Sequence, residues 1–192
     1  MSSTEPSPAE NHSNCMNRLE YAISSNPRVH HLLQSIEKLG CPIPKDFFSC
    51  QTCDKTISGG FTPNNDKNNK NYSPKIIMCD TPMDNTTFEN TLVHELVHAY
   101  DQCKIKIDWK NCLHHACSEI RASSLSGECT YDQEVNRGHH KVGGGGIDCV
   151  KRRAGLSVAA NPYCKDVAKD AILATYDYCS NDKAPLEHEY EN

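Results

Sequence analysis

The sequence predicts an α+β fold that is mostly helical, contains one small antiparallel hairpin and is stapled by disulfides. Several segments carry apolar residues at helical spacing, two short apolar runs resemble strands, and twelve cysteines are spread through 192 residues. A chain of this length can bury one core. We expect a single domain at residues 14–183, between a disordered polar N-terminus (1–13) and an acidic tail (184–192).

The first elements are a long helical pattern and a hairpin. The helical pattern covers residues 15–39 and is interrupted near Pro27, because proline cannot continue a helix. Residues 59–61 and 75–79 resemble two short strands, separated by an Asn- and Lys-rich loop at 64–71. A hairpin here could present an edge strand to an extended peptide.

Three further helices are expected in the second half of the chain. Thr86 and Glu89 can form a capping box at the start of the first of them. Asp108 is a candidate N-cap for the next, which Gly127 would end. The last helix is expected at residues 163–179.

The first of these helices carries the most informative motif, His94-Glu95-Leu-Val-His98. Residues four apart lie on one face of a helix, so both imidazoles can reach one metal ion. Glu95, turned by about 100° around the axis, can take a proton from a water molecule at the metal. Glu95 is the only charged residue between residues 91 and 100, which indicates a buried helix rather than a chance match.

A catalytic zinc site needs a third protein ligand. Glu119, on the following helix, is the favoured candidate. The alternative without a metal is that Glu119 is a surface carboxylate in an ion pair, for example with Arg121. Asp101 is the second candidate, but its position a turn further along the helix axis favours a role in orienting a histidine. His114 and His115 remain open as ligands, or as one packed and one solvated imidazole.

Charge and cysteine content restrict the partners and the compartment. A formal net charge of −5 argues against nucleic acid, and residues 151–153 form a short basic run, interpreted as a solvated face that could touch anionic lipid. No apolar run approaches the roughly 18 residues of a membrane span. Twelve cysteines favour disulfides, yet no signal peptide is visible. The mitochondrial intermembrane space satisfies both conditions; the alternative is a cytosolic or nuclear adaptor with reduced thiols.

The Cys50-x-x-Cys53 pair has no second CxxC to complete a four-thiolate zinc site, so a zinc ribbon is not expected. The surroundings also lack the strand-loop-helix context of a redox-active CxxC. Disulfide connectivity cannot be read from the sequence.

Taken together, these residues and several further motifs resemble those of a known family. The family comprises the mitochondrial inner-membrane-associated metalloproteases that process a mitochondrially encoded subunit of ATP synthase and help to assemble the membrane sector of that enzyme. The resemblance runs from about residue 50 to residue 183. Its motifs, besides residues 91–101, are Gly59-Gly60-Phe61, Asp108-Trp109 and the runs at residues 116–122, 125–129, 149–154 and 179–182. It is weakest at residues 64–71 and in the Gly-rich loop at 143–146.

The resemblance implies a zincin-like, zinc-dependent endopeptidase, folded oxidatively in the intermembrane space and bound peripherally to the inner membrane. By position, His94 and His98 match the metal ligands and Glu95 matches the catalytic glutamate. The implied substrate and partner is a hydrophobic membrane protein, the precursor of an ATP synthase subunit. The alternative is a non-catalytic assembly chaperone or adaptor that uses the same fold.

Overall fold

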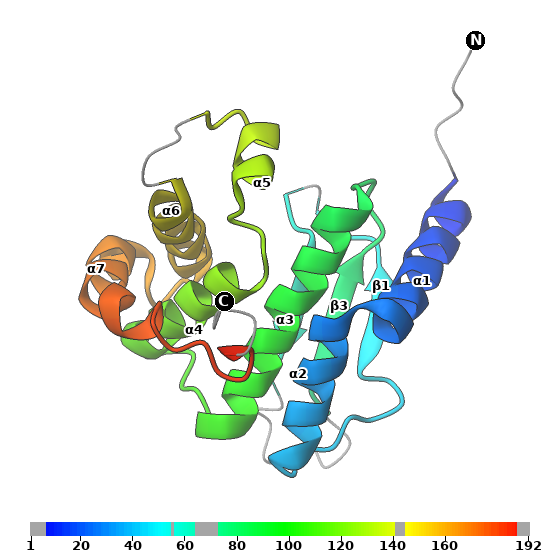
Figure 1. The fold of residues 1–192 in the computed structure, drawn as a ribbon, viewed down its shortest axis with the longest axis horizontal. Coiled ribbons are helices and arrows are strands. Elements are labelled where there is room, and N and C mark those ends of the chain that lie inside the picture. The colour runs from blue at the N-terminus through cyan, green and yellow to red at the C-terminus, as the bar shows by residue number, and fades with distance from the viewer. Residues whose placement is uncertain (1–6, 55, 64–72, 141–144, 188–192) are drawn as a thin grey trace. The chain divides into compact units, whose positions relative to one another are not determined.

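Two compact units make up the chain, residues 1–99 and residues 100–192, and the boundary falls inside one helix, α3 (Asn85–Ile105). The expected single domain at residues 14–183 stays a prediction. The structure, a computed structural model, describes residues 7–54, 56–63, 73–140 and 145–187 (Figure 1).

The first unit begins with helix α1 (Pro8–Ser25), which starts earlier than the expected residue 15. A complete capping box explains the early start. The Ser7 hydroxyl accepts a hydrogen bond from the Glu10 amide at 3.3 Å, and the Glu10 carboxylate accepts one from the Ser7 amide at 2.7 Å. Both groups satisfy helix N-terminal donors that would otherwise need water. The rest of the expected disordered segment, residues 1–6, lies outside the described residues.

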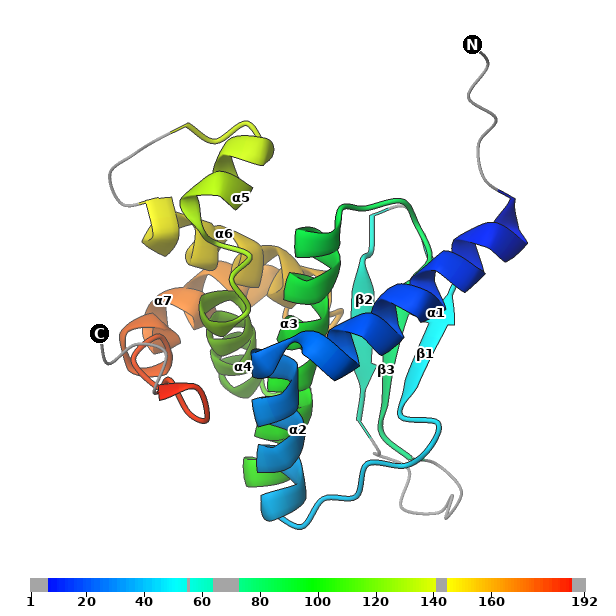
Figure 2. The same cartoon turned by 45° about the vertical axis from the view of Figure 1, so that its right-hand side comes forward.

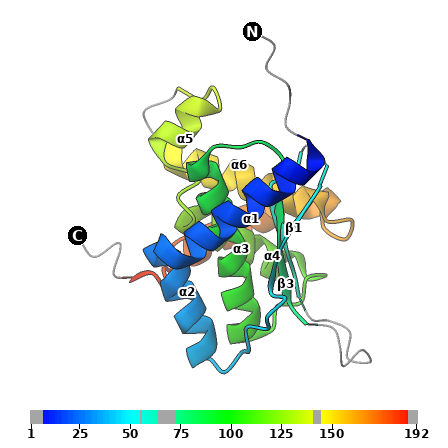
Figure 3. The ribbon, with the colours of Figure 1, turned by 90° about the vertical axis from the view of Figure 1, so that its right-hand side faces the viewer.

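Helix α2 (Pro27–Lys38) follows after a single residue, so the expected interruption near Pro27 is confirmed. Asn26 ends α1 and caps α2, since its side-chain oxygen accepts hydrogen bonds from the amides of Arg28 and Val29 at 3.0 and 3.3 Å. Figures 2 and 3 show the change of direction between the two helices. Buried aliphatic residues on both helices contribute to the core of this unit.

The sheet of this unit has the order β1-β3-β2, with β3 in the middle (Figure 2). Strands β2 (Gly59–Thr62) and β3 (Lys75–Cys79) pair antiparallel, which confirms the expected hairpin. The third strand, β1 (Phe48–Gln51), was not expected and pairs parallel to β3, which makes the sheet mixed. Four residues carry too little alternation to identify a strand from sequence, and the pairing of β1 depends on β3.

Helix α3 is capped by Asp84 rather than by the expected Thr86. The Asp84 carboxylate accepts hydrogen bonds from the Thr87 amide at 2.9 Å and from the Thr87 hydroxyl at 2.6 Å. Glu89, the expected second member of the capping box, instead accepts a hydrogen bond from the Asn26 side chain at 2.8 Å. Aspartate competes successfully for the cap because it offers a charged acceptor near the positive end of the helix dipole.

The second unit contains helices α4 (Cys112–Leu125), α5 (Tyr131–Asn136), α6 (Gly145–Ala160) and α7 (Ala168–Cys179), with a 3-10 turn, η1 (Lys165–Val167). Helix α4 packs against both α6 and α7 (Figure 1). The buried core of the second unit consists largely of small and branched side chains: Ala116, Ile120, Val150, Ala154, Val158, Ala171 and Ile172. Small residues at such contacts let helix backbones approach closely, which suits a chain with few aromatic residues.

Helix α4 differs from expectation at its N-terminus but not at its C-terminus. Asn111, not Asp108, is the N-cap, and its side-chain oxygen accepts hydrogen bonds from the Leu113 and His114 amides at 3.0 and 3.4 Å. Gly127, with φ of 86°, follows the C-cap, as expected for a helix end.

Other expectations for the second unit were incomplete. Helices α5 and α6 were not expected, and α6 begins at Gly145, inside the expected Gly-rich loop; residues 143 and 144 lie outside the described residues. The expected last helix is a 3-10 turn followed by α7. The chain stays packed through Leu186, which is fully buried, whereas residues 188–192 of the expected acidic tail are outside the described part.

Candidate metal centre

The motif residues His94, Glu95 and His98 lie in the middle of α3, as expected. The two imidazole rings meet edge to face, with centroids 4.8 Å apart and planes at 81°. Glu95 is 7% exposed and His98 is 5% exposed, while His94 is half-buried. The helix is therefore buried around most of its circumference, in agreement with the uncharged flanks of the motif.

Strand β2 lies directly against this helix. A Cβ atom placed on Gly59 would meet the Thr91 methyl group at 2.9 Å and the Ile77 carbonyl oxygen at 3.1 Å. Only glycine allows this approach, because contacts under 3.0 Å require a neighbour to move. Gly59 therefore brings β2 against α3 one turn before His94. This gives a packing reason for a glycine that the sequence places at the start of a strand.

Glu119 lies on α4 and is 6% exposed, so it is not the surface carboxylate that the alternative without a metal requires. Its Oε1 atom lies 3.2 Å from Nε2 of His115, one helical turn earlier. Arg121, the suggested partner for a surface ion pair, is instead bound to Asp101. A buried carboxylate of this kind needs polar partners or a cation, since an isolated buried charge is costly.

His94, His98 and Glu119 form a group that could hold a metal ion, with one potential ligand atom from each residue and all three atoms within 4.8 Å of one another. Two imidazole nitrogens and one carboxylate oxygen are the protein ligands of one common class of catalytic zinc site, which keeps a fourth position for water. The chemistry of these donors therefore fits zinc. The fit is also compatible with other divalent metals that accept imidazole and carboxylate ligands.

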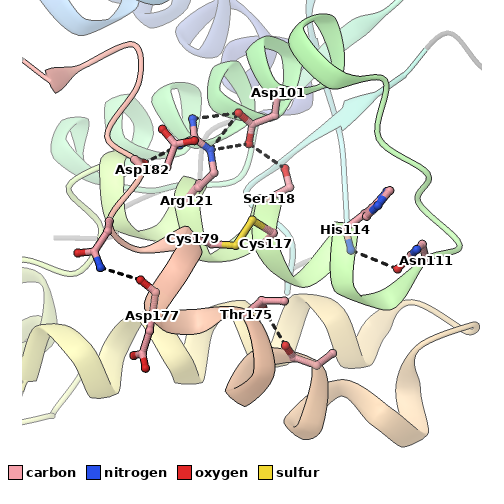
Figure 4. Close-up of a disulfide and its surroundings, with 12 residues drawn as sticks. Asp101, Asn111, His114, Cys117, Ser118, Arg121, Thr175, Asp177, Cys179 and Asp182 are labelled. Atoms are coloured by element: carbon pink, nitrogen blue, oxygen red, sulfur yellow. Dashed lines mark hydrogen bonds and ion pairs between the residues drawn. A yellow bond between two sulfur atoms is a disulfide. The ribbon is translucent and has the colours of Figure 1, made fainter.

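Asp101, the second candidate for the third ligand, is engaged by an arginine. Its carboxylate accepts hydrogen bonds from Nε of Arg121, at 3.1 Å to each oxygen, and from the Ser118 hydroxyl at 3.4 Å. Arg121 also pairs with the Asp182 carboxylate at 2.7 Å (Figure 4). It donates a further hydrogen bond to the Ala184 carbonyl. Asp101 thus serves to hold Arg121, in place of the expected role of orienting a histidine.

Burial and charge oppose each other in this cluster. Burial raises the pKa of Asp101, and the guanidinium of Arg121 works against that rise. Burial alone would lower the pKa of Arg121. The carboxylates of Asp101 and Asp182 raise this pKa by more than burial lowers it, so the arginine stays charged. Arg121 neutralises two carboxylates and links α4 to the end of α3 and to the C-terminal segment.

The two adjacent histidines of α4 differ in burial, as expected if one imidazole is packed and the other solvated. His115 is 8% exposed and contacts Glu119, whereas His114 is exposed and its Nδ1 lies 3.4 Å from the Asp108 amide. The pair therefore comprises one packed and one solvated imidazole. Alternation of burial on a helix explains this, because successive residues point about 100° apart.

The cysteines are all bonded in the structure. Cys50 pairs with Cys15 and Cys53 pairs with Cys79, so the CxxC residues belong to two separate disulfides. This arrangement agrees with the expectation of neither a zinc ribbon nor a redox-active CxxC. The bonds of the second unit join Cys112 to Cys164, Cys117 to Cys179, and Cys129 to Cys149, and Cys41 and Cys103 are disulfide-bonded as well.

The basic run at residues 151–153 is not the solvated face that was expected. Arg152 pairs with Glu134 at 2.6 Å, and Arg153 pairs with Glu128 at 2.6 Å, while both glutamates are buried. Burial raises the pKa of Glu134, but hydrogen bonds from its arginine neighbours lower it by more. These half-buried arginines tie α6 to α5 and to the loop before it, so they are partners of buried glutamates rather than freely solvated charges.

Comparison with known proteins places these features in a family. A model of the peptidase M76 family matches residues 13–187. The chain belongs to this family. The match to the M76 peptidases spans both units and includes the motif helix, α4 and α7.

Several curated relatives of this M76 chain share a name. The mitochondrial inner membrane protease ATP23 of Yarrowia lipolytica is 39% identical over 180 residues, which cover 92% of this chain and 68% of the relative. The protein of that name from Debaryomyces hansenii is 39% identical, with 92% and 72% covered. The one from Schizosaccharomyces pombe is 34% identical, with 99% and 100% covered. No solved structure matches the chain. Among the described helices, none combines the length and apolar character needed to cross a membrane.

Several contacts around the candidate centre were not predicted from the sequence. Trp109 and Asn161 both contact His115, although Asn161 is 46 residues away along the chain. Arg121 was considered only as a possible surface partner. No local signal could have identified these contacts, because each depends on helices that meet only in the folded unit.

Proposed function

We propose that this chain is a zinc-dependent endopeptidase, in which His94, His98 and Glu119 hold the metal and Glu95 carries the proton. The observation that carries the proposal is the buried group of two histidines and one glutamate, with Glu95 directly after the first ligand. Membership of M76, which is a metallopeptidase family, supports it.

The chemistry follows from this donor set. Zinc held by His94, His98 and Glu119 would polarise the scissile carbonyl and lower the pKa of a nearby water molecule to about 7. Glu95 accepts the proton of the attacking water as the carbon–oxygen bond forms. It then delivers that proton to the leaving amine as the carbon–nitrogen bond breaks. The low exposure of Glu95, at 7%, favours this transfer because few water molecules compete for the carboxylate.

The sheet supports a peptide as the substrate. β2 pairs with β3 along one edge, and within the described residues no strand pairs with its other edge. An extended peptide can add to such an edge through main-chain hydrogen bonds, which bind sequence-tolerantly. Gly59 keeps this strand against α3, so a peptide on β2 would run beside the motif helix.

The proposal extends to substrate and place. The relatives named above are mitochondrial inner membrane proteases. By that likeness we assign this chain to the intermembrane space, bound peripherally to the inner membrane. The proposed substrate is the hydrophobic precursor of an ATP synthase subunit, and the chain would also assist assembly of the membrane sector. This part rests on the family resemblance of the motifs rather than on a contact in the structure.

Zinc stoichiometry of the purified, oxidised protein tests the metal site without a substrate. The native chain is compared with His94→Ala and Glu119→Gln, and His114→Ala serves as the matched control on the exposed face of α4. We expect one zinc per native chain and per control chain, and loss of zinc from the two site variants. Equal zinc in the native protein and His94→Ala would contradict the proposed site.

The catalytic role is tested by Glu95→Gln, which removes proton transfer but none of the proposed ligands. We expect the variant to retain zinc and to lose at least about 100-fold of the peptidase activity, the lower range for a general acid–base. Peptidase activity surviving intact would overturn the assignment of Glu95. Restoration of ATP synthase assembly by the same variant would show that the assembly role does not need cleavage, as the chaperone alternative requires.

A further inference from the structure

A second set of polar side chains in the second unit converges on Glu119 through His115. Nε2 of His115 lies 3.2 Å from Oε1 of Glu119, and Nδ1 lies 3.1 Å from the side-chain nitrogen of Asn161. Both ring nitrogens are therefore engaged, and the His115 side chain is only 10% exposed. Their donor and acceptor roles depend on which nitrogen carries the hydrogen.

The surroundings of Asn161 determine which ring nitrogen of His115 carries the hydrogen. Its side-chain oxygen accepts a hydrogen bond from the Tyr163 amide at 3.0 Å, and its side-chain nitrogen donates to the Trp109 carbonyl at 2.9 Å. A backbone amide can only donate and a backbone carbonyl can only accept. The orientation of the Asn161 amide is thus fixed at both ends, and its second N–H points to His115.

The tautomer of His115 follows from this orientation. Because Asn161 donates to Nδ1, Nδ1 must be an acceptor, and the hydrogen of the neutral ring lies on Nε2. Nε2–H then donates to Oε1 of Glu119. The imidazole thereby transmits the fixed orientation of Asn161 to the carboxylate.

We propose that His115 is a positioning residue, whose Nε2–H hydrogen bond holds the Glu119 carboxylate in the orientation required of a metal ligand. The inference rests on the proposed role of Glu119 as the third ligand. Hydrogen bonds of this kind fix the rotation of a ligating group and lower the conformational cost of metal binding. His115 acts through Glu119 and does not itself need to touch metal or substrate.

The position of His115 is itself supported from several sides. The Trp109 ring packs edge-on against the imidazole at 5.5 Å, and the Trp109 indole N–H donates to Gln102 on α3 at 2.8 Å. The disulfide between Cys112 and Cys164 joins the first residue of α4 to the segment that carries Asn161. Asn161 and His115 are 46 residues apart in sequence, so this bond helps to keep them in register.

Two variants of His115 separate the hydrogen bond from the bulk of the ring. His115→Phe keeps a planar ring and removes both nitrogens, whereas His115→Gln places an amide N–H near the position of Nε2. We expect His115→Phe to weaken zinc binding by about 10- to 100-fold, and His115→Gln to recover most of that loss. His114→Phe, one residue earlier on the exposed face, is the matched control and should bind zinc like the native chain.

The measurement is competition for zinc ion between the zinc-free, oxidised full chain and a chromophoric chelator. Thermal unfolding of each zinc-free variant shows whether it is folded, so loss of affinity in an unfolded variant is not counted. If His115→Phe fails to fold, Asn161→Leu, which removes the donor to Nδ1, replaces it and is expected to weaken zinc binding in the same direction. Imidazole nitrogen chemical shifts of the zinc-free native chain should show hydrogen on Nε2 of His115 and not on Nδ1.

The outcomes separate this inference from the proposed function. Zinc lost in His94→Ala but bound with native affinity by folded His115→Phe would overturn the role of His115 alone. Hydrogen on Nδ1 of His115 would do the same. A native chain that binds no zinc, or binds it independently of His94, would overturn both proposals. Weakened binding in His115→Phe with recovery in His115→Gln would support both.

Discussion

At the scale of single residues, Arg121 shows how a buried charge holds segments of the second unit together. Its side chain is 5% exposed and pairs with Asp101 at 3.0 Å and with Asp182 at 2.7 Å. It also donates hydrogen bonds to the carbonyl groups of Asp182 and Ala184. Removal of one partner from a buried pair leaves the other charge without compensation, which costs more than the pair itself contributes.

Replacing Arg121 by methionine should therefore lower the free energy of unfolding by about 3–5 kcal/mol. Urea unfolding with the disulfides intact measures the loss. Lys75→Met is the control, because Lys75 and Asp46 form an exposed pair that should contribute about 0–1 kcal/mol. A loss for Arg121→Met no larger than that of the control would contradict the role of this cluster.

At the scale of secondary-structure elements, two adjacent glycines of β2 have opposite surroundings. A Cβ atom on Gly59 would lie 2.9 Å from the Thr91 methyl group, whereas a Cβ on Gly60 would have nothing within 4 Å. Neither glycine has a positive φ, so both backbones accept an alanine. The difference between them is therefore one of space and not of backbone conformation.

Gly59→Ala should destabilise the protein by about 1–3 kcal/mol, because the added methyl overpacks the contact with α3. Gly60→Ala should instead stabilise it by about 0.4–1 kcal/mol by restricting the unfolded chain. Thr91→Ser removes the obstructing methyl and keeps the hydroxyl that donates to the Thr87 carbonyl at 2.8 Å. Thermal unfolding should show partial recovery in the Gly59→Ala, Thr91→Ser double variant; equal effects of the two glycine substitutions would rule out this packing.

The cap of α3 adds a dependence on pH. Hydrogen bonds from the side chain and backbone of Thr87 hold the pKa of Asp84 below its usual value. A carboxyl whose pKa is lowered by folding contributes stability that is fully present above its unfolded pKa, about 3.9. That contribution is lost as the pH falls through the lower pKa of the folded state.

Asp84→Ala should cost about 1 kcal/mol at neutral pH, the usual effect of removing an N-cap. The difference from the native chain should shrink as the pH falls below about 4, because the protonated Asp84 caps less well. Asp84→Asn retains a capping oxygen and does not titrate, so it separates the cap from the charge. Urea unfolding at a series of pH values measures this; a difference constant down to pH values well below the usual aspartate pKa would contradict the cap.

At the scale of the whole molecule, disulfides supplement modest cores in both units. In the first, Cys15–Cys50 ties α1 to β1. In the second, bonds of α4 reach the segment after α6 and the end of α7, at Cys164 and Cys179. Cross-links stabilise a fold mainly by restricting the unfolded chain, and the effect grows slowly with the length of the closed loop.

Removing the Cys112–Cys164 bond, with a sequence separation of 52, by double alanine substitution should cost about 4 kcal/mol. Removing Cys129–Cys149, with a separation of 20, should cost about 3 kcal/mol. Alkylation before reduction should label no cysteine in the native chain, since none is free. Urea unfolding of both variants tests the order; the reverse order would show that native contacts outweigh loop entropy.

Much of the local structure could be predicted because it depends on near neighbours in sequence. The motif helix, the strands at residues 59–61 and 75–79, the break at Pro27 and the helix end at Gly127 each carry a short-range signal. Caps were less predictable. Asp84 and Asn111 replaced the expected residues because several polar residues precede each helix, and the sequence does not show which one meets the free amides.

By itself, the sequence determined that one buried helix carries His94, Glu95 and His98 on neighbouring faces, and it marked Glu119 as the candidate third ligand. Helical spacing and an uncharged flank suffice for that, since both act within a few turns. Tertiary structure alone decided that Asp101 binds Arg121, that Asn161 contacts His115, and which cysteines pair. These contacts join residues 20 to 62 positions apart. Packing of helices determines them, and no local pattern records which distant residues packing brings together.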